Sequence, residues 1–149
     1  MCWLCDHPDH NFDDYLDGLH AILSDHDYFI QGVTGDPETA GCAYTVGLTR
    51  RDRPELVVTG LRHPRAAAVL DHAARLPATA TTPGARITIS GIVYESLTVV
   101  DPTARLLVAE AVFGPDIAAV QLAHPDRYGL WPWDRRYTGT QPLLGLPAY

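Results

Sequence analysis

Apolar residues recur at helical spacing in two parts of the chain. In residues 12–25 they fall three or four positions apart, which places them on one face of a helix. Asn11 can cap that helix, and Asp13 and Asp14 meet the positive end of its dipole. A second stripe follows Pro64, a residue suited to the first turn of a helix. We therefore predict helices over residues 12–25 and 64–76.

Short runs rich in β-branched and aromatic residues predict strands. We expect them over residues 28–33, 42–48, 56–60, 86–90, 92–100 and 118–124. The second and third runs flank a charged connection and lead directly into the helix from Pro64, so they predict a hairpin that feeds a helix. One face of the second run carries Ala43, Thr45 and Gly47, small residues that would let a backbone, a helix or a ligand approach closely.

The remaining segments decide the fold class. Asp101 and Pro102 resemble a helix start, and the apolar residues 106–113 fit either a helix or a strand, so we expect a helix that runs into a strand. Residues 125–149, rich in Pro and Gly, predict an irregular tail over the body. Hairpins outnumber crossovers, which predicts an α+β fold with a mainly antiparallel or mixed sheet, able to curl into a partial barrel, flanked by two or three helices.

Length and composition fit one domain over residues 1–149. Apolar residues make up 46% of the chain, which argues against disorder. No apolar run approaches the ~20 residues that cross a bilayer, and the first ten residues lack the features of a signal peptide. We expect a cytoplasmic protein without a membrane partner; its oligomeric state is left open.

The charge balance is acidic, with 18 Asp and Glu against 11 Lys and Arg, a net charge of −7. Such a surface repels phosphate backbones, so we expect no nucleic-acid partner. Arg50, Arg51 and Arg53 form a short basic run, which we interpret as a solvated loop rather than a binding patch.

Several motifs occur in a fixed order along the chain. They are the opening Met-Cys-x-x-Cys-Asp, AYTVGL at 43–48, PEL at 54–56, TGL at 59–61, VQL at 120–122, Asp126 and WPWD at 131–134. Together they resemble a family of short bacterial proteins, common in actinobacteria, known as domain of unknown function 4262. The resemblance spans nearly the whole chain and implies no established chemistry. It implies that the paired thiols, Tyr44-Thr45 and the Trp-Pro-Trp tail are features of the family and do not occur by chance.

The N-terminal segment, residues 1–11, carries a possible metal site. Cys2 and Cys5, separated by two residues, can hold one tetrahedral ion, and His7 and His10 could complete the ligand set of zinc or another transition metal. The same thiols could instead act as a redox pair, or pack as a terminus without chemistry. A second Cys-x-x-Cys pair, which would strengthen the metal prediction, is absent from the sequence.

A second group of residues could bind a cofactor. Arg62 and His63 stand between a strand and a helix N-terminus, where free N–H groups attract phosphate or carboxylate, and Thr59 lies close by in the sequence. Trp131 and Trp133 could wall an aromatic pocket, as flavin or haem requires, or staple the tail to the body. The alternative is that Arg62 and His63 are ordinary solvated turn residues.

His124 closes the last predicted strand, a position where functional side chains often gather. It is our candidate general base, with Asp126 nearby and Tyr44 completing a pocket. No phosphate-binding G-x-x-x-x-G-K-[ST], no G-x-G-x-x-G after a strand and no G-x-S-x-G occurs. Kinases, nucleotide hydrolases, Rossmann dehydrogenases and typical serine esterases are therefore disfavoured.

Three functions fit these observations. The first is a small metal-binding protein or metal-dependent enzyme that acts on a small-molecule substrate, with the ion as Lewis acid and His124 as base. The second is a split-barrel protein that holds flavin or haem. The third is a non-catalytic partner-binding or immunity-type module. We favour the first, because of the thiol pair and the seven histidines.

Overall fold

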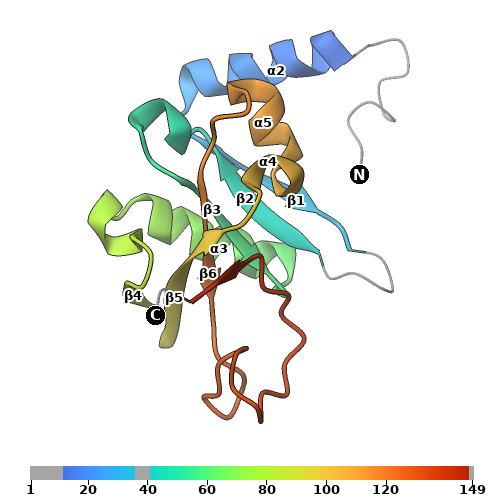
Figure 1. Cartoon of the computed structure of the whole chain (residues 1–149). Helices are drawn as coiled ribbons and strands as arrows, with labels where there is room; N and C mark the ends of the chain where they lie inside the picture. The colour runs from blue at the N-terminus through green and yellow to red at the C-terminus, as the bar shows by residue number, and fades with distance from the viewer. Residues whose placement is uncertain (1–11, 36–40, 148–149) are drawn as a thin grey trace.

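The computed structural model describes residues 12–35 and 41–147, which form an open sheet with helices on both faces (Figure 1). Its elements are α2 (Phe12–Asp25), β1 (Phe29–Val33), β2 (Cys42–Val46), the 3-10 helix η1 (Leu48–Arg51), β3 (Glu55–Thr59), α3 (His63–Ala74), the 3-10 helix η2 (Ala78–Thr81), β4 (Arg86–Ile89), β5 (Ile92–Val99), α4 (Pro102–Arg105), α5 (Leu107–Phe113), β6 (Ala119–Ala123) and β7 (Gly145–Leu146). The predicted α+β class is confirmed, with four α-helices in this part of the chain where two or three were expected.

The strand order is β1-β2-β3-β6-β5-β4, with β7 paired to β5. β3 and β6 run parallel, and every other pair is antiparallel. The hairpin of β2 and β3 leads into α3, as predicted. β1 and β4 stay at opposite ends of the strand order, so the sheet does not close into the partial barrel that the hairpins had suggested.

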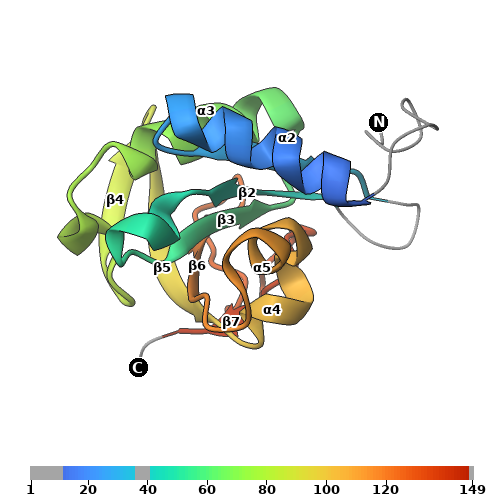
Figure 2. The same cartoon turned by 90° about the horizontal axis from the view of Figure 1, so that it is seen from above.

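Two core clusters lie on opposite faces of the sheet. α3 covers one face, where Ala43 of β2 packs in the same cluster as Ala66 and Leu70 of the helix. This is the small-residue face predicted to admit a close neighbour. α4 and α5 cover the other face, and α2 lies beside α5 (Figure 2). His124, at the end of β6, belongs to the α3 side.

The structure corrects the sequence prediction in two segments. Residues 107–113 form α5 alone, without the strand that we expected to follow the helix. The tail is irregular as predicted, except that Gly145 and Leu146 pair with Thr98 and Val99 of β5. No helix among the described residues combines the length and the apolar character that crossing a bilayer requires.

The basic run after β2 is exposed at Arg50 and Arg51, as expected for a solvated loop, and it also has a structural role. Arg50 donates at 2.8 Å to three backbone carbonyls at and just after the end of α2. Arg53 donates at 3.0 Å to the carbonyl of Ala74, the last residue of α3. Arg51 pairs with Asp27 at 2.6 Å. Helix ends leave carbonyls without partners, and two of these guanidinium groups cap them.

A buried carboxylate organises the turn between β2 and β3. Glu55 is fully buried, and its two oxygens accept hydrogen bonds from the backbone N–H groups of Gly47, Leu48 and Thr49 at 2.8–3.2 Å. The hydroxyls of Thr45 and Thr49 also donate to it. The carboxylate therefore caps the start of η1, where backbone donors have no partner within the helix.

Candidate functional site

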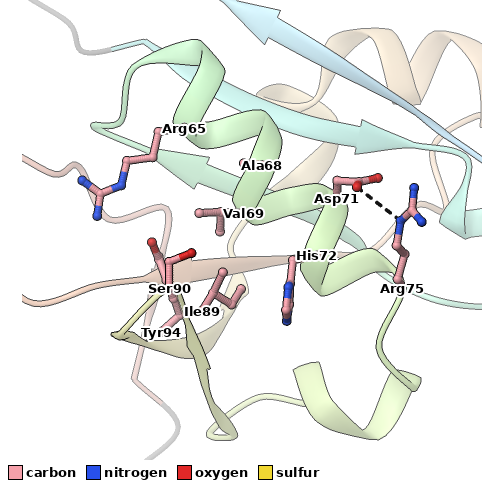
Figure 3. A pocket seen from close by; sticks show the side chains of 9 residues that line it. All are labelled: Arg65, Ala68, Val69, Asp71, His72, Arg75, Ile89, Ser90 and Tyr94. Carbon is pink, nitrogen blue, oxygen red and sulfur yellow. Dashed lines mark ion pairs between the residues drawn. The ribbon is translucent and has the colours of Figure 1, made fainter.

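Two hollows lie between α3 and the hairpin of β4 and β5. The first, which we call the His124 pocket, has a volume of about 590 Å³ and is lined by the start of α3, the β4–β5 turn and the loop after β6. The second, which we call the α3 groove, has a volume of about 500 Å³ and follows α3 toward Arg75 (Figure 3). Arg65 lines both hollows.

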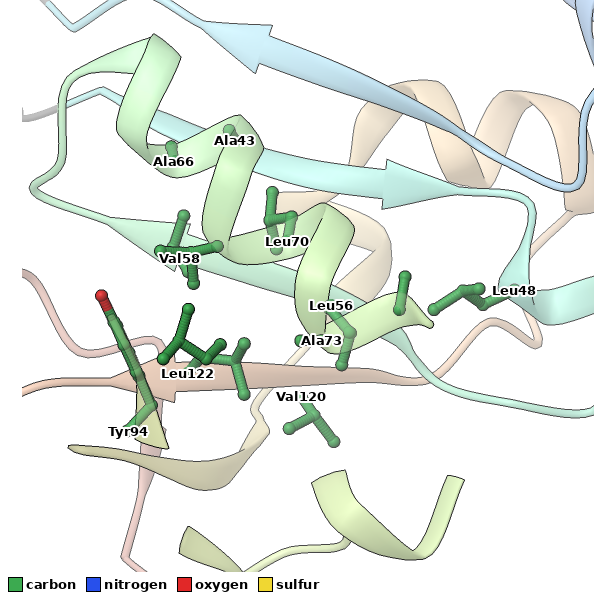
Figure 4. Close-up of a cluster of buried hydrophobic side chains, with 13 residues drawn as sticks. Ala43, Leu48, Leu56, Val58, Ala66, Leu70, Ala73, Tyr94, Val120 and Leu122 are labelled. Carbon is green, nitrogen blue, oxygen red and sulfur yellow. The ribbon is translucent and has the colours of Figure 1, made fainter. Parts of the chain in front are cut away.

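His124 sits where β6 ends and its ring packs edge-on against Tyr94 of β5, with ring centroids 5.8 Å apart. Tyr94 is almost fully buried in the core cluster beneath α3, beside Leu122 (Figure 4). The Nε2 atom of His124 is buried and forms no hydrogen bond with any residue in the described part of the chain. This nitrogen has no surface open to solvent, and the backbone of Thr59 also acts on the ring, so it faces the interior of the protein.

The tail holds the backbone of His124 in place. The side-chain amide of Gln141 accepts from the His124 N–H at 3.1 Å and donates to the His124 carbonyl at 2.8 Å, as a neighbouring strand would. The same amide nitrogen lies 3.3 Å from Nδ1 of the ring. Gly60 permits this approach, because a Cβ there would lie 3.2 Å from the Cα of Gln141. The tail therefore fixes the orientation of the imidazole.

Burial lowers the pKa of His124 below its ordinary value, because charge is disfavoured away from water. The backbone of Pro125 and Thr59 offsets part of this shift, and the positive charge of Arg65 adds to it. The folded protein therefore favours the neutral imidazole, which can donate one hydrogen bond and accept another.

This shift makes a prediction about pH. The unfolded chain takes up a proton at His124 near pH 6.5, before the folded protein does, so stability is lost as the pH falls from 6.5 toward the lower folded pKa. The His124→Gln variant should lose less stability than the wild type between pH 7.5 and 5.5, by at most about 1.4 kcal/mol per pH unit. Urea unfolding at a series of pH values measures this difference. Equal slopes in the two proteins would contradict the assignment.

The wall of the His124 pocket is positively charged. Arg65 and Arg127 line it, and neither forms an ion pair with a described residue. Burial raises the pKa of the Tyr94 phenol, and the charge of Arg65 and its hydrogen bond with the phenol offset part of this shift. Arg127 lies over the ring of Tyr128, 5.0 Å from its centroid. Neither guanidinium charge is neutralised by a carboxylate of the described residues.

Asp126 lines the same pocket, but its carboxylate is engaged by its own loop. It accepts from the N–H groups of Tyr128 and Leu130 at 2.9 Å and from the N–H and hydroxyl of Thr138 at 3.0 Å. Burial acts to raise the pKa of Asp126, but these hydrogen bonds outweigh it and hold the pKa below its ordinary value. The geometry gives Asp126 a part in shaping the loop, and its catalytic role stays a prediction.

Tyr44 lies on the other face of the sheet from His124. It is buried in the cluster under α5, and its hydroxyl accepts a hydrogen bond from the Val108 N–H at 3.0 Å. Burial raises the pKa of Tyr44 to about 12, so the phenol stays protonated at neutral pH. The structure does not bring Tyr44 and His124 into one pocket.

The residues that we proposed for cofactor binding are dispersed. Thr59 is buried and donates to the Pro142 carbonyl at 2.6 Å, which fastens the tail. Arg62 is exposed, and the ring of His63 lies over β1 near Gly32. They do not form one site with the tryptophans.

Trp131 and Trp133 stack on each other, with ring centroids 5.2 Å apart. The guanidinium of Arg86, from β4, lies 4.7 Å from the centroid of Trp131 and is paired with the buried Glu95 at 2.9 Å. This ladder fits the alternative in which the tryptophans staple the tail to the sheet.

The predicted metal ligands Cys2, Cys5, His7 and His10 lie outside the described residues. Within residues 12–35 and 41–147, no group of three or more His, Cys, Asp or Glu side chains could hold a metal ion.

Sequence reasoning overlooked the residues that frame His124. Arg65 lines the pocket from α3, Tyr94 packs against the His124 ring from β5, and no local pattern marks either residue. Gln121 did carry a signal, since a glutamine in the middle of an apolar strand needs a partner for its amide. It is fully buried and binds the tail at the Pro142 carbonyl and the Leu144 N–H.

A protein-family model described as "Domain of unknown function (DUF4262)" matches residues 22–138. No curated protein and no solved structure shows significant similarity to the chain.

Proposed function

Because the chain belongs to the DUF4262 family, whose description assigns no chemistry, we propose from its own geometry that it binds a small organic anion, of the carboxylate type, in the His124 pocket. The observation that carries this proposal is the pair of exposed arginines beside the half-buried imidazole of His124. Arg65 and Arg127 face a cavity without a carboxylate partner among the described residues, in a protein with 18 acidic side chains.

The chemistry of these groups suits a carboxylate. Guanidinium groups form short, charge-assisted hydrogen bonds with carboxylate oxygens. The ring of His124, which burial keeps neutral, lines the same cavity beside the two arginines. Among the described residues that line the pocket there is no serine, threonine or cysteine, so they support binding rather than attack by a side-chain hydroxyl or thiol.

Zinc binding by Cys2, Cys5, His7 and His10 stays a prediction from their spacing. The same holds for flavin or haem and for a partner-binding role. The proposal for the His124 pocket depends on none of them, since it uses only residues of the described part of the chain.

Acetate binding tests the proposal. Titration of ¹⁵N-labelled protein should shift the amide resonances of the loop after β6 in a saturable manner. Arg65→Gln and Arg127→Gln should each weaken acetate about tenfold or more, because a hydrogen bond to a charged group contributes about 1.5–3 kcal/mol.

Arg105→Gln is the matched control, because Arg105 is exposed on α4, which packs on the opposite face of the sheet. This variant should bind acetate as the wild type does. A wild type without saturable shifts, or three variants with the same affinity, would refute the proposal.

A further inference from the structure

Apolar side chains line the His124 pocket beside its charged groups. They come from the segment between β3 and α3, from the start of β5 and from the loop after β6, and they are Leu61, Ile92, Val93 and Pro125. Each of them is partly exposed, so its hydrocarbon surface is accessible to a ligand. We call these four residues the apolar patch.

The apolar patch rests on the core of the protein. Leu61 and Ile92 pack against the buried cluster beneath α3, which includes Tyr94. A surface supported by a close-packed core keeps its shape without a ligand. Small-molecule sites typically combine such apolar walls with a few polar groups, and here Arg65 and Arg127 supply the polar groups.

The pocket is open to solvent near two glycines. Gly91 lies in the β4–β5 turn and Gly129 in the loop after β6, and both line the pocket. A Cβ added at either position would meet no atom within 4 Å. A small ligand can therefore enter between the turn and the loop without a rearrangement of the sheet.

The accessible apolar surface ends with this pocket. In the neighbouring α3 groove, the side chains of Val69, Ile89 and Tyr94 are only 4%, 5% and 1% exposed. His72 and Ser90, which are exposed, border the groove instead (Figure 3). A long chain that left the pocket along α3 would gain little from hydrophobic burial. The geometry therefore favours a compact apolar group.

We infer that the ligand is a carboxylate with a compact apolar group, which lies against the apolar patch while the carboxylate binds Arg65 and Arg127. This inference rests on the proposed function, because it takes the anion site as its anchor. It adds the class of molecule: an acid that carries a branched or cyclic hydrocarbon, rather than a long chain or a fully polar anion.

Acetate, pivalate and pentanoate test the inference. Burying one CH₂ group completely strengthens binding roughly fourfold, so covering half of it should give about twofold. Pivalate has three more carbons than acetate, all in a compact tert-butyl group, and should bind about eightfold more tightly. Pentanoate has the same number of carbons in a straight chain that extends beyond the patch, and it should gain about fourfold or less. Calorimetry or the ¹⁵N titration measures the three affinities on the full chain.

Intermolecular nuclear Overhauser effects locate the bound ligand without any substitution. The tert-butyl protons of pivalate should give such effects to the methyl groups of Leu61 and Ile92. They should give none to the methyl groups of Val100, which is 62% exposed just after the end of β5 and does not line the pocket.

A matched pair of variants measures the contribution of the patch. Ile92→Thr keeps a β-branched side chain and replaces hydrocarbon with a hydroxyl, so the advantage of pivalate over acetate should fall to about fourfold or less while acetate binding stays unchanged. Val100→Thr makes the same type of change outside the pocket and should change neither affinity.

The outcomes separate this inference from the proposed function. If acetate binds and pivalate binds no tighter, or if pentanoate binds as tightly as pivalate, only the inference is wrong. An undiminished pivalate advantage in Ile92→Thr, or Overhauser effects to Val100 in place of Leu61 and Ile92, would also overturn the inference alone. If none of the three carboxylates binds, both the inference and the proposed function are wrong.

Discussion

Replacing Glu55 with alanine should lower the free energy of unfolding by about 4 kcal/mol, which is a large part of the 5–15 kcal/mol that small domains possess. The change leaves three backbone N–H groups and two hydroxyls in a buried turn without their acceptor. Removing one partner from such a network costs the full desolvation of the groups left behind. Urea unfolding followed by circular dichroism measures the loss.

Two further variants make this prediction specific. Glu55→Gln keeps the shape of the side chain but turns one acceptor into a donor that faces donors, so it should cost about 2 kcal/mol. Asp116→Ala removes an exposed carboxylate and should stay within about 0.5 kcal/mol of the wild type. If Glu55→Ala lowered the free energy of unfolding no more than Asp116→Ala does, the carboxylate of Glu55 would contribute little to stability.

The fold could be predicted to the extent that local periodicity determines it. The strands follow from runs of β-branched and aromatic residues, and the two long helices follow from the three-to-four spacing of apolar residues. Residues 106–113 are apolar on nearly all sides, so periodicity could not separate a helix from a strand, and packing against α2 and β2 decides for the helix. β7 has two residues, too few for any pattern, and exists because β5 offers it a partner.

The site could be predicted only where the sequence itself marks a strand end. That rule found His124, but which other residues share its pocket depends on register. The parallel pairing of Val57 with Gln121 and the antiparallel pairing of Tyr44 with Val57 place these three residues on one face. His124 is three positions after Gln121 and faces the other side. Nothing local in the sequence specifies the β3–β6 pairing, so Tyr44 could not be separated from His124 in advance.

The roles of the arginines could not be predicted from the sequence either. The sequence does not show which arginines have a structural role. Only the tertiary structure shows whether a carbonyl or a carboxylate binds each guanidinium group. Arg50 and Arg53 donate hydrogen bonds to backbone carbonyls near the ends of α2 and α3, whereas Arg65 lines a cavity. In this chain the position of an arginine relative to helix ends and cavities, and not its neighbours in sequence, separates a structural residue from a binding candidate.

Gly47→Ala should destabilise the protein by at least about 3 kcal/mol, through the same turn that Glu55 caps. Gly47 has φ +144°, a conformation that other residues rarely adopt, and a Cβ there would lie 2.4 Å from the Asp27 carbonyl oxygen and 2.6 Å from the Tyr28 Cα. Neither neighbour is a flexible side-chain end, so the backbone between α2 and β1 must move. Denaturant unfolding measures the loss, and a midpoint equal to that of the wild type would contradict the steric reason.

Gly18→Ala is the matched control for this substitution, because a Cβ at Gly18 meets no atom within 4 Å and the residue lies inside α2. It should stabilise the protein by about 0.5–1 kcal/mol, since alanine favours helix more than glycine does.

In the double variant of Gly47→Ala and Glu55→Ala, the total loss in free energy of unfolding should be smaller than the sum of the two single losses. Once the turn has moved, its N–H groups no longer reach the carboxylate, so the second change removes bonds that are already broken. Strictly additive losses would mean that the glycine and the carboxylate stabilise the turn independently.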